Sequence, residues 1–187
     1  MCTHVARFYA DAYPVAEVVD FFAVGLEAGD SCFALLTAQH RLAVEGSMRS
    51  RGIVLESVAY VAVDSDEAWS KMQVNGTLDL GKASALLAPL MIPPCNGKNA
   101  RVRVVGDMAS MLCAAGKTED AVTFEGLMHR LTQEYGASTI CAYPIKKHLA
   151  YDGFWGLMRL SAQHAAIEFP QQLWAHHLVP DELGGRS

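Results

Sequence analysis

Five side chains with titratable or hydrogen-bonding groups lie in or directly after segments that have the composition of β-strands: His4, Tyr9, His40, Asp107 and Tyr143. An imidazole titrates near neutral pH, and a phenol can pack its ring while it donates a hydrogen bond. Ligands of parallel α/β sheets bind outside the carboxyl ends of the strands. We therefore expect a shared pocket at that edge, lined by His4, Tyr9, Asp107 and Tyr143.

Two carboxylates have alternative interpretations. Glu125 lies within a predicted helix, on a side that otherwise carries apolar residues such as Met128. It is expected to point inward to a His or Arg partner, either as a structural pair or as part of a site. Asp107 follows a strand, where it could hold magnesium, but magnesium binds weakly without phosphates or a second ligand. A role at the start of the next helix is the favoured interpretation of Asp107.

A phosphate-binding loop is missing where the pattern would place one. Such a loop needs glycines whose N–H groups converge on the anion, a Lys, and a Ser or Thr for magnesium. The loop after the apolar run Ser31–Thr37 reads Thr-Ala-Gln-His-Arg. The turn Gly116–Thr118 lacks an upstream glycine and follows no strand, so it is interpreted as a helix connection. ATP hydrolysis by this route is not expected.

The sequence gives no spacing signal for a metal site or a disulfide framework. Its five cysteines are Cys2, Cys32, Cys95, Cys113 and Cys141, which are widely spaced and form no CxxC pair. We expect reduced, mostly buried thiols. The adjacent His176 and His177 cannot share one helix face. No metal and no cofactor is therefore expected.

Apolar runs alternate with segments of helical periodicity along the whole chain. Strands are predicted at residues 4–9, 31–37, 58–63, 102–105 and 139–143. Helices are predicted at residues 15–26, 38–51, 65–72, 83–90, 108–113, 121–135 and 154–167. This alternation predicts an α/β fold of three layers, with a mostly parallel central sheet and helices on both faces.

The segment from Gly25 to Gly52 combines a Gly-Leu-x-x-Gly turn, a buried strand, a loop and a helix that ends in glycine. It resembles the opening of RecA- and KaiC-like ATPases, which implies a RecA-like fold without a phosphate loop. The order of further features resembles the MEDS sensory domain family: His4 with Phe8-Tyr9, GLEAGD, AVDSDEA, RVRVVGDM, Phe124-Glu125, ICAYP and His164. The family more often has Gly-Glu-Met where this chain has Gly106-Asp107-Met108, so the acid here is shorter by one methylene.

This resemblance implies a sensory or regulatory domain over residues 1–170, followed by a tail at 171–187, and no enzyme activity. It implies a small-molecule ligand and a protein partner that carries the output, with homo-oligomer formation as a further option. The alternative is a RecA- or KaiC-like protein with residual nucleotide binding. A hydrolase is disfavoured because no nucleophile motif is present.

Charge and hydropathy argue against two further classes of partner, nucleic acid and membranes. The net charge of −5 and the scattered Lys and Arg disfavour direct binding of nucleic acid. No apolar run reaches the length needed to cross a membrane, and the first residues have no signal-peptide core. We expect a cytoplasmic protein without membrane contact.

Overall fold

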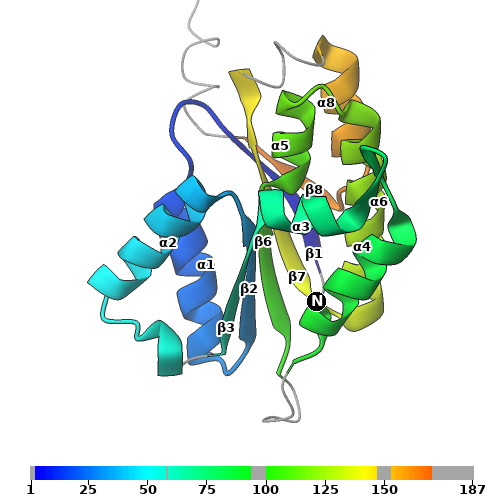
Figure 1. The fold of residues 1–187 in the computed structure, drawn as a ribbon. Coiled ribbons are helices and arrows are strands. Elements are labelled where there is room, and N and C mark those ends of the chain that lie inside the picture. The colour runs from blue at the N-terminus through cyan, green and yellow to red at the C-terminus, as the bar shows by residue number, and fades with distance from the viewer. Residues whose placement is uncertain (1–2, 58, 94–99, 147–152, 170–187) are drawn as a thin grey trace, which may run out of the picture.

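The fold is built on a six-stranded sheet in which every pair of neighbouring strands is parallel (Figure 1). The computed structural model describes residues 3–57, 59–93, 100–146 and 153–169. The strand order is β3-β2-β6-β7-β1-β8. These strands are β1 (Thr3–Tyr9), β2 (Ser31–Leu36), β3 (Tyr60–Asp64), β6 (Val102–Gly106), β7 (Ser138–Pro144) and β8 (Ala166–Glu168).

Helices connect these strands and cover both faces of the sheet. The helices are α1 (Val15–Glu27), α2 (Ala38–Ser50), α3 (Ser65–Met72), α4 (Leu80–Leu87), α5 (Met108–Ala114), α6 (Thr118–Tyr135) and α8 (Gly153–Ser161). Two 3-10 turns, Leu55–Ser57 and Ala88–Met91, and a short hairpin of β4 (Gln73–Val74) and β5 (Thr77–Leu78) complete the described elements. The predicted three-layer α/β fold is confirmed.

Two apolar cores lie on opposite faces of the sheet. On one face, α1 and α2 pack on alternate residues of β2, such as Cys32, Ala34 and Leu36. On the other face, α3, α4, α5, α6 and α8 pack over Phe33 and Leu35 of the same strand. Figure 1 shows these two helical layers on the left and right of the sheet. Because β2 is buried on both faces, its sequence is a continuous apolar run rather than an alternating one.

Local sequence explains where several elements begin and end. The side chain of Asp64 accepts hydrogen bonds from the backbone N–H groups of Asp66 and Glu67, so it caps the start of α3. Gly136 ends α6 with a φ of 65°, a conformation that glycine adopts without steric cost. Residues 115–117 connect α5 to α6, so the predicted helix connection is confirmed, although Thr118, which was predicted to lie in the turn, is the first residue of α6.

Three features of the carboxyl-terminal and central regions differ from the sequence-based expectation. The helix predicted over 154–167 ends at Ser161, and residues 166–168 form β8, which pairs with β1 at Val5–Arg7. The β4–β5 hairpin was also not predicted. Both are short pairings of two or three residues, too short for a periodic signal.

The described thiols match the expectation of reduced cysteines. Cys32, Cys113 and Cys141 are buried thiols, whereas Cys2 and Cys95 lie outside the described residues, as do His176, His177 and the predicted tail. Among the helices of the described part of the chain, none has the length and apolar character to span a membrane.

Candidate functional site

The carboxylate of Asp107 is the centre of a polar cluster at the carboxyl ends of β2, β3 and β6. It accepts hydrogen bonds from the backbone N–H of Thr37 at 3.0 Å and from its hydroxyl at 2.8 Å. Ser65 donates a third hydrogen bond at 2.9 Å, and His40 Nδ1 lies 2.6 Å away. Since a carboxylate only accepts, the His40 Nδ1 must carry the proton. Asp107 thus holds together the starts of α2 and α3.

The position of Asp107 corrects its expected structural role in part. It directly precedes α5, but its side chain makes no capping hydrogen bond to that helix. It instead binds the N–H of Thr37, the residue before α2. A helix N-terminus attracts anions because its first N–H groups have no partner within the helix. Here an internal carboxylate already occupies that position.

Aromatic rings connect this cluster to the end of β1. The ring of Tyr13 stacks on His40 with centroids 3.9 Å apart, and Tyr9 meets Tyr13 edge to face at 5.7 Å. Burial, together with the negative charge of Asp107, raises the pKa of Tyr9 to about 12. The same two causes raise the pKa of Tyr13 well above its ordinary value. Both phenols therefore stay protonated at neutral pH.

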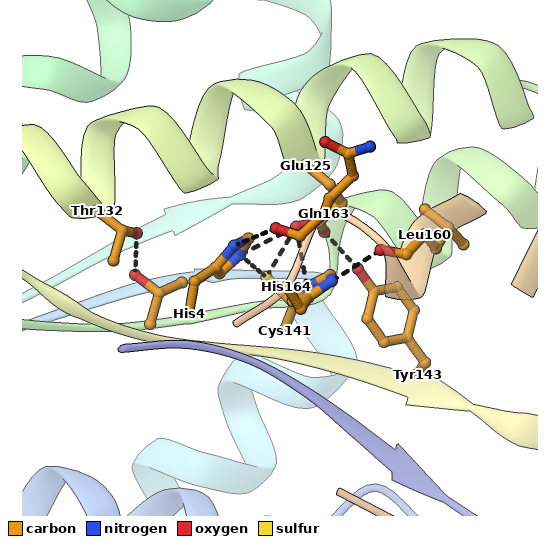
Figure 2. A network of polar contacts seen from close by, with 9 residues as sticks. His4, Glu125, Thr132, Cys141, Tyr143, Leu160, Gln163 and His164 are labelled. Atoms are coloured by element: carbon orange, nitrogen blue, oxygen red, sulfur yellow. Dashed lines mark hydrogen bonds and ion pairs between the residues drawn. The ribbon is translucent and has the colours of Figure 1, made fainter. Parts of the chain in front are cut away.

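A second polar cluster lies under α6, on the opposite side of the sheet from α1 (Figure 2). Glu125 projects from α6 and is buried. Its Oε1 accepts a hydrogen bond from the Tyr143 hydroxyl at 2.5 Å, and its Oε2 accepts one from the Cys141 thiol at 3.2 Å. The Nε2 atoms of His4 and His164 lie 3.2 and 3.3 Å from the same Oε2. The inward His partner expected for Glu125 is therefore present, and there are two of them.

Ionisation of this second cluster is set by a balance between burial and pairing. Burial acts to raise the pKa of Glu125, but the His164 and His4 imidazoles beside its carboxylate outweigh burial, and the net pKa lies well below the ordinary value. Burial acts to lower the pKa of His164, and pairing with Glu125 raises it above the ordinary value. Burial and the Glu125 charge raise the pKa of both Cys141 and Tyr143. When no other ion is bound, Glu125 therefore carries the negative charge of the cluster.

The six site residues predicted from the sequence fall into these two clusters rather than one pocket. Tyr9, His40 and Asp107 belong to the first, whereas His4, Glu125 and Tyr143 belong to the second. The expectation of a single shared pocket is therefore wrong. Side chains alternate between the faces of a strand, so His4 and Tyr9, an odd number of residues apart on β1, point to opposite faces. Their roles in ligand binding stay predictions.

Register also separates His4 from Tyr143 along the sheet. His4 pairs with Thr139 near the start of β7, and Tyr143 pairs with Phe8 near its end. Their side chains nevertheless reach the same carboxylate, because Glu125 extends between them from α6 (Figure 2). Thr37 and Ser65 lie in the strand-end segments 37–40 and 64–66, which the sequence marked as candidate positions without giving either residue a role. Tyr13 was not assigned to a site, because its aromatic side chain carries no spacing signal.

Cavities lie at both ends of the sheet. One of about 320 Å³ is at the carboxyl end of β1, lined by Arg7, Phe8, Tyr9, Ala10, Asp11, Ala12, Pro14 and Glu17. A larger, mostly apolar one of about 380 Å³ lies where β2, β3 and β6 begin, beside the 3-10 turn that ends at Met91. Tyr9, Tyr13 and His40 form an aromatic chain that leads from the end of β1 to Asp107. Of the two cavities, only the one at the carboxyl end of β1 is lined by a residue of this chain, Tyr9.

Comparison with known proteins adds one match. The model of the family described as the MEthanogen/methylotroph, DcmR Sensory domain (MEDS) matches residues 3–152. This range contains all six predicted site residues and excludes His164. No curated protein matches the sequence.

Proposed function

Since the chain belongs to the MEDS family of sensory domains, we propose that it is a non-catalytic sensory domain that binds a small molecule in the cavity at the carboxyl end of β1. The family description supports a sensory or regulatory role. The choice of this cavity rests on one observation, which is its contact with the aromatic chain that leads to Asp107.

The cavity has the properties of a small-ligand site. Its volume of about 320 Å³ lies at the lower end of the range for small-molecule sites. Its lining combines the aromatic rings of Phe8 and Tyr9 with the charged groups of Arg7, Asp11 and Glu17. Arg7 is ion-paired with Glu17 and with Glu168 of β8. A ligand that competes for one of these charges also changes the contact between β1 and β8.

A ligand in this cavity has a direct physical route to the rest of the domain. Tyr9 lines the cavity and contacts Tyr13, which stacks on His40. His40 donates to Asp107, which in turn holds Thr37 and Ser65. A displacement of Tyr9 therefore changes the contacts that position the starts of α2 and α3. We propose that this change is the signal, read by a protein partner or a second copy of the chain.

The Asp107 cluster argues against the nucleotide-binding alternative. Binding of a phosphate at the start of α2 requires free N–H groups and a positive environment. The carboxylate of Asp107 takes the Thr37 N–H and adds a negative charge there. A phosphate would be repelled by this carboxylate and would have to displace it.

Titrations followed by amide NMR test the proposal. The probes are a short alcohol, a short carboxylate and a short amine, with Mg-ATP as the probe for the alternative. We expect one of the three small probes to shift the amide signals of Tyr9 and Ala10 and, through the stack, that of His40. In Tyr13→Leu, the shift at Tyr9 should persist while the shift at His40 is lost.

An exposed variant far from the cavity, Val74→Ala, serves as the matched control and should respond like the unmodified protein. Shifts by Mg-ATP at Thr37 and Ala38 would favour the nucleotide alternative. Absence of any shift at the cavity with all three small probes would refute the proposed site.

A further inference from the structure

Four side chains with metal-ligating atoms converge in the buried cluster under α6. His4, Glu125, Cys141 and His164 each direct one nitrogen, oxygen or sulfur atom to a common point, and these four atoms all lie within 4.8 Å of one another (Figure 2). They come from β1, α6, β7 and the segment between α8 and β8. All four side chains are nearly inaccessible to solvent.

Backbone carbonyls orient both imidazoles. The Nδ1 of His4 lies 3.2 Å from the carbonyl oxygen of Gln163, and the Nδ1 of His164 lies 2.8 Å from that of Leu160. A carbonyl oxygen can only accept a hydrogen bond, so each Nδ1 carries a proton. In a neutral imidazole, the Nε2 then has its lone pair exposed to the centre of the cluster. Metal-binding histidines are commonly oriented by this kind of contact.

The cluster contains more lone pairs than protons to share among them. With both imidazoles neutral, the Cys141 thiol is the one donor among the four inward atoms, and it can donate to Glu125 or to His4 but not to both. His164 Nε2 is buried and makes no well-directed hydrogen bond with any described residue, although Glu125 Oε2 lies 3.3 Å away. An unpaired buried acceptor beside a carboxylate is costly. A cation at this point, either a proton on an imidazole or a metal ion, removes this cost.

Four of the six distances between the inward atoms are close to those around a tetrahedral metal ion, and the other two, from His164 Nε2 to His4 Nε2 and to Cys141 Sγ, are at most 4.8 Å. Bonds of about 2.0 to 2.3 Å, as zinc makes to N, O and S ligands, place neighbouring ligand atoms roughly 3.3 to 3.8 Å apart. Glu125 Oε2 lies 3.2 Å from both His4 Nε2 and Cys141 Sγ. Cys141 Sγ and His4 Nε2 are 3.3 Å apart.

We infer that His4, Glu125, Cys141 and His164 form a four-ligand site for a divalent transition-metal ion, with Zn²⁺ as the best fit. Two imidazoles, one thiolate and one carboxylate are ligands of the kinds that zinc accepts, whereas Mg²⁺ and Ca²⁺ prefer oxygen. Binding converts the Cys141 thiol into a thiolate and releases its proton to solvent. Tyr143 orients the carboxylate through its hydrogen bond to Glu125 Oε1.

The buried position of the site indicates a structural role. Four protein ligands leave no open position for a substrate, as in structural zinc sites. The ion would fasten the segment after α8 to the central strands, next to the backbone hydrogen bond from Ala165 to His4 and the pairing of β8 with β1. It would thereby link the edge strand β8, which contains Glu168, to the core. This inference does not depend on the ligand cavity proposed above.

Metal analysis of the intact protein tests this site. Protein purified without chelators should contain about one equivalent of zinc per chain, and the chelated protein should recover its original melting temperature with Zn²⁺ but not with Mg²⁺. Titration of the chelated protein with Co²⁺ should saturate at one equivalent and give the charge-transfer absorption of a thiolate ligand together with the visible bands of tetrahedral Co²⁺.

Variants identify the ligands. Cys141→Ser should lose the thiolate absorption, and His164→Gln should bind Co²⁺ much more weakly. Tyr143→Phe should keep the spectrum and bind about tenfold more weakly, because it removes a contact that orients a ligand. Cys113→Ser, which changes another buried cysteine outside the cluster, should bind like the unmodified protein. The Co²⁺ spectrum of the unmodified protein is enough to show whether a thiolate is a ligand. The site can therefore still be tested if one of the variants fails to fold.

Two results would overturn the inference. The first is chelated but folded protein that binds neither Zn²⁺ nor Co²⁺ when these are added in slight excess. The second is a thiolate spectrum that disappears in Cys113→Ser and survives in Cys141→Ser. Either would leave the cluster as a hydrogen-bonded network whose cation is a proton on an imidazole.

Discussion

The carboxylate of Asp107 lies 3.0 Å from the backbone nitrogen of Thr37, the residue that directly precedes α2. At this position, a nucleotide-binding protein would hold a phosphate against the helix N-terminus. The chain instead supplies an anion of its own. Ser65 and His40 bind the same carboxylate, so its removal affects two helix starts at once.

We predict that Asp107→Ala lowers the free energy of unfolding by about 2 to 3 kcal/mol, because it leaves buried donors of Thr37 and Ser65 without an acceptor. Asp107→Asn should cost less, since an amide oxygen still accepts. Chemical denaturation measures both, with the exposed Glu134→Gln as a control that should stay within about 0.5 kcal/mol. A loss of the same small size in all three variants would contradict the role of Asp107.

Calorimetry with Mg-ATP should give no dissociation constant tighter than the millimolar range for the unmodified protein. The reason is the segment Thr37–Arg41 at the start of α2, which lacks the glycines and the Lys of a phosphate loop and begins against the Asp107 carboxylate. A micromolar constant that weakens when this segment is changed would overturn the expectation.

The buried hydroxyls of Thr132 and Thr139 lie 2.7 Å apart and form one hydrogen bond between α6 and β7. Replacing Thr139 alone by Val should destabilise the protein by about 1 to 3 kcal/mol, because the Thr132 hydroxyl loses its partner. The double variant Thr132→Val/Thr139→Val should be more stable than the sum of the two single losses predicts. A double-mutant cycle by urea denaturation measures this coupling. Simple additivity would show that the pair contributes nothing as a pair.

Alkaline stability should report on Tyr9. Its pKa is raised from 10.0 to about 12 in the folded protein, so the folded state keeps the phenol protonated after the unfolded state has released its proton. This contribution to stability is complete below about pH 10 and is lost as the pH rises to about 12. Tyr9→Phe should therefore lose less stability over this window, as measured by urea denaturation at a series of pH values. Parallel curves for the two proteins would refute this assignment.

Gly25 in α1 lies directly against Arg103 of β6. A Cβ at this position would be 2.3 Å from Cδ of Arg103, whose Nε donates to Asp30 at 2.9 Å. Gly25→Ala should displace Arg103, break this ion pair and lower stability by about 1 to 3 kcal/mol. Gly46→Ala in α2, where a Cβ meets nothing within 4 Å, should instead raise stability by about 0.5 to 1 kcal/mol. Thermal denaturation distinguishes the two, and equal effects would exclude the steric explanation.

Local patterns in the sequence were sufficient to predict most of the elements. The continuous apolar run that became β2 and the helical periodicity of α1 and α6 are confirmed, because burial on one or both faces imposes a residue pattern that is visible in the sequence. β8 escaped prediction because it has three exposed residues and exists through its pairing with β1. Whether such an edge strand forms depends on the partner strand as much as on the residues of the segment itself.

By itself, the sequence determined the α/β class, the absence of a phosphate loop after β2, and the inward position of Glu125, since each depends on residues close together in the chain. Only the tertiary structure decided which side chains meet. The strand order places β7 next to β1, and the alternation of side chains sends His4 to α6 and Tyr9 to the other face. His4, Glu125, Cys141 and His164 meet although each comes from a different segment, so no spacing rule could connect them. Their proximity arises from packing across the sheet, which acts between residues far apart in the sequence.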